Sequence, residues 1–277
     1  MNYAIFRCCV TNRLLQEYET ATDGVLTAID IPALDIRDFG CCGYPLRNVD
    51  YTASMYSAAR NFALAERAGL DILTVCNCCF GSLKQAAYSL AADPGLAAGS
   101  KERLEKEGLT LSGEVRVRHL LQVLYQDIGP GELSERICRP LHGLRAVIHY
   151  GCHLLRPSDV VGFDDPFDPS ICEDLVAAVG VECLDWERRL DCCGAPLAGT
   201  FDDLSLSLSR QKLRAAAGVG AHCLLCVCPF CQLQFERARR EMINRGQDTP
   251  EVVGFVQLLA AALGREQNLP VLQLSGK

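Results

Sequence analysis

The fold of this chain is decided by two stretches, LDILTVCNCCF at residues 70–80 and HCLLCVCPFCQ at residues 222–232. Each stretch begins with a short apolar run, which is typical of a buried strand. Each then reaches a C-x-x-C pair and continues into a segment with helical spacing. Because Cys228 follows Cys76 by 152 positions, the two stretches predict that one structural unit occurs twice.

A longer cysteine pattern extends outward from both stretches. In each half a single cysteine precedes a Cys-Cys-Gly motif and then the C-x-x-C motif, with spacers of 31, 33 and 2 residues in the first half and 39, 34 and 2 in the second. Matching cysteines lie 143, 151, 151, 152 and 152 positions apart, which indicates an internal duplication. The first set is Cys9, Cys41, Cys42, Cys76 and Cys79, and the second set is Cys152, Cys192, Cys193, Cys228 and Cys231.

Five thiols in each set exceed the four that a zinc site or a simple cubane cluster requires. Adjacent cysteines point apart in an extended chain, so both can face one centre only at a turn. Gly43 and Gly194 supply the conformational freedom for that turn. The pattern therefore favours an unusual polynuclear iron–sulfur centre in each half.

Strands and helices alternate in both halves, which predicts an α/β protein with two pseudo-repeated domains, each a small, mainly parallel sheet flanked by helices. We place the domains at residues 1–136 and 137–277. The cysteines then lie at the carboxyl ends of strands, where parallel sheets present their ligands. The expected strands are 3–10, 31–36, 70–75, 145–150, 181–185 and 222–227, and the expected helices are 14–29, 53–68, 81–92, 115–127, 170–179, 204–217, 232–244 and 249–263.

Composition narrows the class of protein. The chain has 277 residues, 49% of them hydrophobic, and a formal net charge of −7, which argues against a nucleic-acid partner. Its 17 cysteines suit a reducing compartment in a chain that is too long for a small disulfide scaffold. The N-terminus has no signal-peptide pattern, and no apolar run is long enough to span a membrane. We therefore expect a cytoplasmic protein.

Three alternatives to an iron–sulfur centre stay open for the cysteines at this point. They are buried thiols packed as small hydrophobic side chains, a four-cysteine zinc site in one copy, and a thioredoxin-like dithiol at the C-x-x-C pair. Cys8 and Cys78 adjoin predicted ligands and are candidates to replace one. Cys138, Cys172, Cys183 and Cys223 are expected to be buried or incidental, and Cys226 lies two residues before Cys228 on the opposite strand phase.

Two histidines and a lysine lie near the predicted ligands. His153 follows Cys152 and is either a packed core residue or a hydrogen-bond and proton donor at the site. His149 is predicted to be structural. Lys84 either attracts an anionic substrate or is a solvated surface lysine.

The sequences around the cysteine motifs resemble one family. Tyr150-Gly151-Cys152-His153, Asp191-Cys192-Cys193-Gly194-Ala195-Pro196 and Cys228-Pro229-Phe230-Cys231-Gln232 are similar to the B subunit of heterodisulfide reductase, a family with paired cysteine-rich CCG domains. The likeness covers nearly the whole chain, and both C-x-x-C pairs are intact. Cys8 and Cys78 depart from the family pattern.

The resemblance implies an oxidoreductase that acts on a sulfur group. Two noncubane [4Fe-4S] clusters would each be held by one five-cysteine set, and a small disulfide or dithiol would bind between them. Electrons would arrive from two partner proteins that resemble the family's iron–sulfur C subunit and its flavin-containing A subunit, which is capable of electron bifurcation. The expected catalytic residues are Cys41, Cys42, Cys192, Cys193 and His153. The alternatives are an electron-transfer module for another catalytic protein and a zinc-bound scaffold protein.

Overall fold

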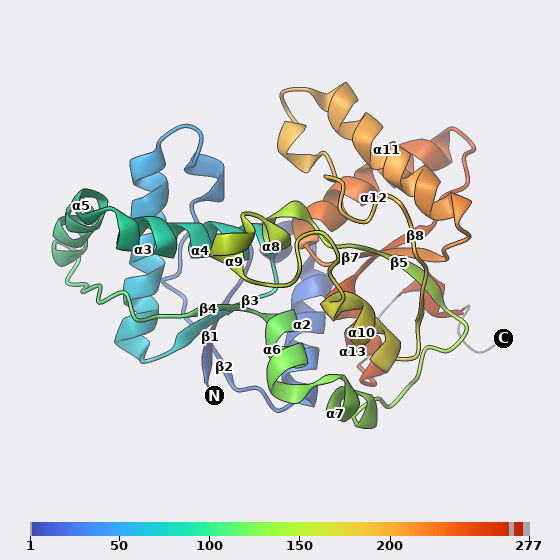
Figure 1. Ribbon diagram of the computed structural model, residues 1–277, viewed down its shortest axis with the longest axis horizontal. Helices are drawn as coiled ribbons and strands as arrows, with labels where there is room; N and C mark the ends of the chain where they lie inside the picture. Colours follow the sequence, from blue (N-terminus) through green and yellow to red (C-terminus); the bar gives the residue numbers. More distant parts are fainter. Residues whose placement is uncertain (1, 266–268, 274–277) are drawn as a thin grey trace.

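The computed structural model describes residues 2–265 and 269–273, and two four-stranded sheets form its centre (Figure 1). All strand pairs in both sheets are parallel. In order across the first sheet lie β2 (Ala33–Asp35), β1 (Tyr3–Phe6), β3 (Asp71–Thr74) and β4 (Val117–His119). In the second sheet the order is β6 (Glu182–Cys183), β5 (Arg145–His149), β7 (Cys223–Cys226) and β8 (Glu251–Gly254). The predicted class, α/β with two pseudo-repeated parallel sheets, is confirmed.

The two sheets also share their register. Tyr3 pairs with Asp71 in the first sheet, and Ala146 pairs with Cys223 in the second. Ala146 follows Tyr3 by 143 positions, and Cys223 follows Asp71 by 152 positions. The same two offsets relate matching cysteines of the two halves. Residues in equivalent places of the two halves can therefore be compared one by one.

Helices of the first half follow each of its strands along the chain. Asp50 begins the longest of them by accepting a hydrogen bond from the amide of Ala53, and Gly69 ends it in the left-handed region. The elements are α1 (Thr11–Leu14), α2 (Gln16–Ala28), the 3₁₀ turn η1 (Tyr44–Leu46), α3 (Tyr51–Ala68), α4 (Asn77–Ala92), α5 (Pro94–Glu105), α6 (Leu120–Val123), the π turn η2 (Leu124–Ile128) and α7 (Pro130–Glu135).

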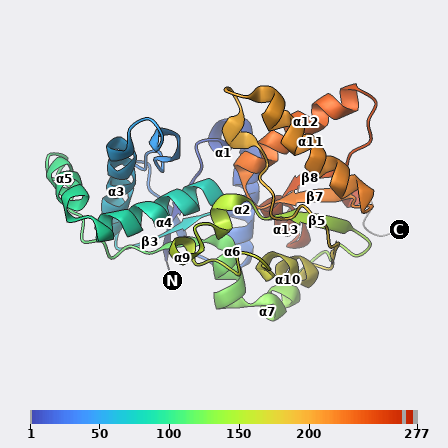
Figure 2. The same cartoon turned by 45° about the horizontal axis from the view of Figure 1, so that its top comes forward.

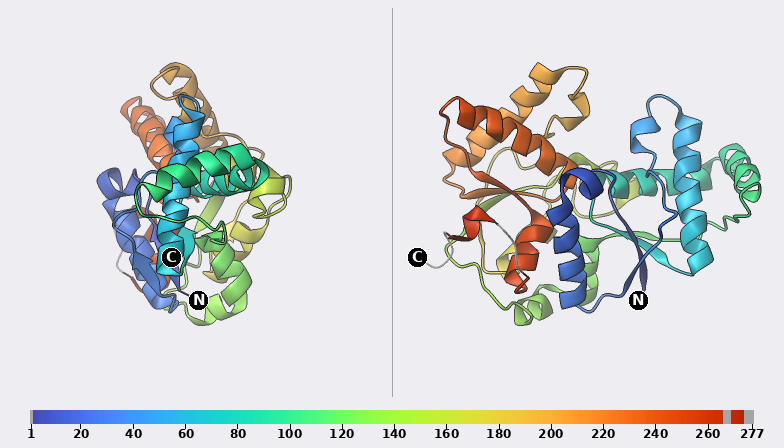
Figure 3. Two further views of the ribbon diagram at one scale, coloured as in Figure 1. Left: turned by 90° about the vertical axis from the view of Figure 1, so that its left-hand side faces the viewer. Right: turned by 180° about the vertical axis from the view of Figure 1, so that it is seen from behind.

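The second half repeats this order with shorter helices after its first strand. The loops at 43–50 and 194–201, which contain the two matching 3₁₀ turns, project on the same side of the molecule (Figure 3). The elements are α8 (Cys152–Leu155), α9 (Ser158–Val161), α10 (Ile171–Ala178), η3 (Ala195–Leu197), α11 (Asp202–Gly218), α12 (Pro229–Asn244), α13 (Phe255–Ala262) and η4 (Pro270–Gln273).

Two of the predicted helices are wrong in their first turn. The segments expected at 115–127 and 249–263 begin as the edge strands β4 and β8, and only then become helical. Val117 and Val252 pair there with the central strands β3 and β7. β-branched residues favour strands, but the helical spacing of the apolar residues does not reveal that the segment begins as a strand. Helix α5 was not predicted, because its glycines and charged residues resemble a loop.

The two halves exchange helices. Helix α2, which follows the first strand of the first half, packs against α13, which follows the last strand of the second half (Figures 1 and 3). Helix α10 makes the reciprocal contact with α6 and η2 of the first half. Helix α4 also crosses to the second half, where it packs on α8 and α9 (Figure 2).

One continuous core results from this exchange. Buried residues of both sheets, such as Ile72 and Leu224, belong to the same cluster of contacting apolar side chains. The hydroxyl of Tyr18 on α2 lies 3.3 Å from the carbonyl oxygen of Val75 and 3.4 Å from that of Val227. Tyr18 thus touches the ends of both central strands, so the interface between the halves lies beside the cysteine motifs.

Candidate metal centre

The cysteines follow the carboxyl ends of the central strands in both sheets. Cys8 and Cys9 come after β1 and Cys76 after β3, while Cys152 and Cys228 come after β5 and β7. The two sheets bring these ends together, since the Sγ atoms of Cys76 and Cys228 lie only 3.9 Å apart. The two five-cysteine sets are therefore adjacent.

Each C-x-x-C pair lies on the first turn of a helix. Cys76 and Cys228 are the N-cap residues of α4 and α12, and Cys79 and Cys231 are the third helical residues. The helices thus begin before the second cysteine of each pair, earlier than residues 81 and 232 where the sequence predicted them. The free amides and partial positive charge of a helix N-terminus then face the thiol groups.

Both Cys-Cys-Gly motifs form the same tight turn. Gly43 and Gly194 have φ angles of +87° and +88°. A Cβ atom at either glycine would lie 2.5 Å from the carbonyl oxygen of Ser54 or Ser205, so only glycine fits. In the second turn the amides of Gly194 and Ala195 donate to the Sγ atoms of Cys192 and Cys193, each at 3.4 Å. The predicted requirement for glycine is confirmed.

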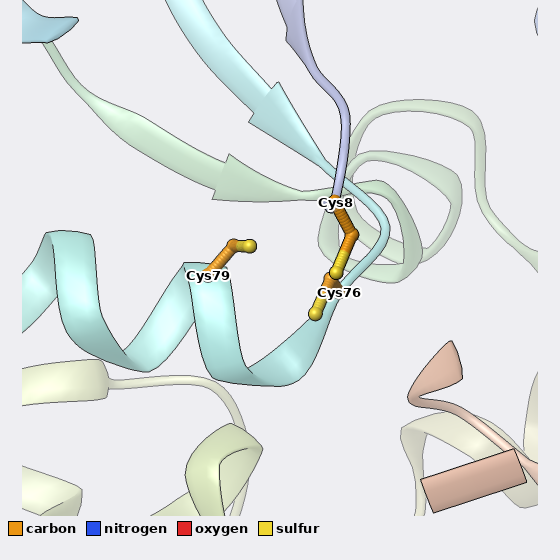
Figure 4. Close-up of side chains that lie close together, drawn as sticks. All are labelled: Cys8, Cys76 and Cys79. Carbon is orange, nitrogen blue, oxygen red and sulfur yellow. The ribbon is translucent and has the colours of Figure 1, made fainter. Parts of the chain in front are cut away.

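Two further thiols, those of Cys8 and Cys78, lie among the cysteines of the first set. The sulfur atoms of Cys8, Cys76 and Cys79 lie within 4.8 Å of one another (Figure 4). Cys9, the expected ligand, is exposed, whereas Cys8 is buried. The sulfur atom of Cys78 lies within 4.8 Å of those of Cys76 and Cys228. Both neighbours of the predicted ligands are thus in the cluster, and the choice of Cys9 as ligand stays a prediction.

Each set contains a thiol that ionises readily. The thiols of Cys41 and Cys79 hold the pKa of Cys42 well below its usual range. The thiols of Cys152 and Cys193 lower the pKa of Cys192 to about 2. The neighbouring thiols that donate to these two have raised pKa values in turn, as at Cys41 and Cys152, so metal binding would have to displace their protons.

The second set has two additional polar neighbours. A ring nitrogen of His149 lies within 4.8 Å of the sulfur atoms of Cys193 and Cys231, and burial holds the pKa of His149 well below its usual range. Lys212 on α11 is also buried, and its Nζ donates to the carbonyl oxygens of Arg188 and Asp191. Burial lowers the pKa of Lys212 to about 8.

These two residues were missed as site residues. His149 was expected to be structural, and Lys212 was not singled out. A single histidine on a strand or a single lysine on a helix forms no motif. A comparison of the two halves of the sequence, aligned by the cysteine offsets, could have identified them. It shows the positions at which a polar residue in the second half replaces a different type of residue in the first.

A cavity of about 390 Å³ opens beside the thiols. His153 is half-buried at a narrower cleft next to it, and its ring packs edge-on against Tyr44 with centroids 4.9 Å apart. Lys84, in contrast, lies near the ring of Phe80 and does not line this cavity. Both halves contribute to the cavity wall, including Cys42, Tyr44 and Cys78 from the first and Ala195, Pro196 and Phe230 from the second.

The residues present fit the implied iron–sulfur centres. All ten predicted ligands belong to the described part of the chain and are free thiols. They approach from three loops in each half. The first set adjoins the larger cavity, whereas the second set lines only the narrower cleft. Four other cysteines are placed as expected, with Cys172 and Cys223 buried, Cys183 half-buried and Cys138 exposed; Cys226 is also buried.

No helix among the described residues has the length and apolar character that crossing a membrane requires.

Comparison with known proteins places this geometry in a family. The CCG cysteine-rich domain matches the chain twice, at residues 3–84 and 146–236. The chain is 34% identical over 268 residues to the B subunit of the ferredoxin:CoB-CoM heterodisulfide reductase of Methanosarcina mazei, an alignment that covers 94% of this chain and 89% of the relative. It is 31% identical over 265 residues to the membrane anchor subunit of the 8-methylmenaquinol:fumarate reductase of Wolinella succinogenes, covering 95% and 92%.

The fold also occurs in a solved structure, a hypothetical protein from Helicobacter pylori. The TM-score is 0.75 at 15% sequence identity, and the match covers 98% of this chain and 50% of that longer chain. This likeness concerns the fold alone. The duplicated domain match, the extent of the alignments and the paired thiol sets agree, and the chain belongs to the family of heterodisulfide reductase B subunits with tandem CCG domains.

Proposed function

We propose that this chain is the catalytic subunit of a heterodisulfide reductase-like complex, which reduces or forms a disulfide at two noncubane [4Fe-4S] clusters. The first cluster would be held by Cys9, Cys41, Cys42, Cys76 and Cys79, and the second by Cys152, Cys192, Cys193, Cys228 and Cys231. One observation carries this proposal: two duplicated thiol sets meet with sulfur atoms 3.9 Å apart beside a cavity walled by both halves. A disulfide has two sulfur atoms, and this arrangement offers each of them a centre.

The reaction consumes two electrons and two protons for each disulfide and yields two thiols. When bound, the clusters would supply the one-electron transfers. Two partner proteins, one with iron–sulfur clusters and one with flavin, would deliver the electrons. The chain itself would enclose the substrate between Tyr44 and Phe230, and His153 at the edge of the cavity would donate a proton to the departing sulfur.

Iron and acid-labile sulfide analysis of anaerobically purified protein tests the cofactor. We expect about eight iron and eight sulfide per chain, together with an electron paramagnetic resonance spectrum that changes when a thiol substrate is added. About two zinc with little iron would instead support the scaffold alternative. One zinc with about four iron would restrict the redox chemistry to one copy.

Substitution of the adjacent cysteines tests the ligand assignment. Cys42→Ser and Cys193→Ser should each lower the iron content by about half and abolish disulfide turnover, because each removes one ligand of one centre. Cys138→Ser is the matched control, since Cys138 is exposed and belongs to neither set. Unchanged iron and turnover in both variants would contradict the assignment.

A second candidate function is an electron-transfer module that feeds another catalytic protein. The Wolinella relative supports it, because its name refers to a menaquinol:fumarate reductase and not to a disulfide enzyme. Full cluster content with rapid electron exchange but no turnover of any small disulfide or dithiol would favour this candidate.

A further inference from the structure

The duplication makes two places in the molecule directly comparable. Phe6 on β1 and His149 on β5 are equivalent, because they pair with Thr74 and Cys226 of the next strand and differ by the strand offset of 143. Both are buried. A purely apolar side chain in the first half is thus replaced by an imidazole in the second.

The imidazole of His149 lacks a partner among the described residues. Neither Nδ1 nor Nε2 makes a hydrogen bond, although the side chain is fully buried. Its ring packs edge-on against Phe235, with centroids 4.9 Å apart, and its near neighbours are the sulfur atoms of Cys193 and Cys231. An unpaired buried polar group is costly, so this N–H requires an acceptor that the chain alone does not provide.

A second difference lies on the helix that follows each Cys-Cys-Gly turn. Lys212 on α11 follows Asn61 on α3 by 151 positions, the offset that relates Cys193 to Cys42. Asn61 donates to the carbonyl oxygen of Cys41 at 2.9 Å, and Lys212 donates to that of Asp191 at the same distance. Lys212 thus donates to the residue before the Cys-Cys pair, whereas Asn61 donates to the first cysteine of its pair, and only Lys212 brings a positive charge.

Among the described residues no carboxylate forms a salt bridge with Lys212, although the charge of Asp191 acts on it from a distance. The Nζ of Lys212 binds two carbonyl oxygens and lies 4.8 Å from the centroid of the Trp186 ring. The side chain of Asp191 is paired with Arg188 at 3.0 Å. In the first half, by contrast, the guanidinium of Arg7 beside Cys8 is surrounded by three carboxylates, those of Glu19, Asp23 and Asp35.

We infer that the two centres are not equivalent and that His149 and Lys212 make the second one the more easily reduced. The inference rests on the proposed iron–sulfur function. An N–H directed at a cluster sulfur and a buried ammonium group both stabilise the added negative charge of the reduced state. Their effect is strong because the surroundings are buried and of low dielectric constant. His149 and Lys212 are positioning and tuning residues, and they do not contact the substrate.

A redox titration followed by electron paramagnetic resonance tests this on the complete, anaerobically purified chain. The wild type should show two midpoint potentials. His149→Phe and Lys212→Asn copy the first half, and each should lower the more positive midpoint by about 59 mV, which is a tenfold change for one electron. The more negative midpoint should stay unchanged. His149→Gln and Lys212→Arg, which keep a donor and the charge, should restore most of the shift.

Lys101→Asn is the matched control, because it removes the same charge from an exposed position on α5. Two equal midpoints in the wild type, or a shift of the more negative one in either variant, would overturn the inference. A loss of about four iron in His149→Phe would also overturn it, because His149 would then be a ligand. Iron and sulfide measured in the same samples separate these results from failure of the proposed function, which would appear as a wild type without clusters.

Discussion

Cys8 and Cys9 follow β1 directly, and the register of the two halves distinguishes them. Cys152 follows Cys9 by 143 positions, which is also the offset between β1 and β5. Cys8 therefore corresponds to Gly151, a residue with a φ angle of +80° and no thiol. The register favours Cys9 as the ligand, although Cys8 lies deeper in the thiol cluster.

We predict that Cys9→Ser lowers the iron content by about half, whereas Cys8→Ser leaves it near the wild-type value. The reason is that Cys9 completes the five-thiol set and Cys8 only packs beside it. Colorimetric iron analysis of the two purified variants distinguishes them. The reverse pattern would assign the ligand to Cys8.

The glycine of each Cys-Cys-Gly turn gives a second prediction at this scale. Gly194→Ala should destabilise the protein by more than Gly199→Ala, although the two glycines have similar φ angles of +88° and +85°. Both substitutions cost about 1–2 kcal/mol for left-handed backbone. Only the first also places a Cβ atom 2.5 Å from the carbonyl oxygen of Ser205. Urea unfolding measures both losses, and equal losses would mean that the turn relaxes without cost.

Sequence alone predicted much of the site because cysteine spacing is a strong signal. The two sets, their place at strand ends and the need for Gly43 and Gly194 followed from spacing, the strand pattern and turn geometry, whereas the proximity of the two sets was implied only by the family resemblance. His149 and Lys212 did not, because their importance depends on burial beside the thiols, which no local pattern reveals. The position of Cys8 among the sulfur atoms depends likewise on side-chain packing.

Among the strands, all were predicted except the two edge strands β4 and β8, whereas the other edge strands, β2 and β6, lie within predicted segments. The central strands β3 and β7 were predicted from continuous hydrophobic segments, since these are buried on both faces. The edge strands β4 and β8 have three and four residues and run directly into helices. Such strands exist because the neighbouring strand offers hydrogen bonds, which is tertiary information.

The close contact between α4 and α8 leads to a prediction for one helix. Gly81→Ala should normally stabilise a helix by about 1 kcal/mol. Here the added Cβ atom would lie 2.7 Å from the carbonyl oxygen of His153, so we expect a net loss of about 1–2 kcal/mol. Gly99→Ala on α5 is the control, since no atom lies within 4 Å of its Cβ position, and it should be stabilising. Thermal unfolding of both variants tests this, and a stabilised Gly81→Ala would show that the helices can separate.

At the scale of the whole molecule, the sequence predicted two domains but not how they interlock. The division at residues 136 and 137 stays a prediction, whereas the exchange of α2 and α13 joins both halves into one core. The sequence could not reveal this exchange. The spacing of apolar residues identifies the apolar face of a helix, but it does not identify the element that packs against that face.

We predict that fragments 1–136 and 137–277 do not fold cooperatively when produced separately, because each exposes the helix face that the other half covers. Mixed together, they should regain a single cooperative transition. Circular dichroism during heating, with size-exclusion chromatography, measures this. Sharp, independent transitions in the separate fragments would show that the halves are autonomous domains.

The reciprocal helix contacts also have a consequence for how far the two centres can differ. A polypeptide with a single copy would leave its α2-like face and its last helix uncovered, and two such polypeptides related by a two-fold axis would cover both faces at once. The duplicated chain thus has the arrangement of a two-fold homodimer whose two protomers are joined in one polypeptide. In a homodimer every substitution appears at both centres. A single chain has no such constraint, and pairs such as Phe6 and His149 show that its two centres differ.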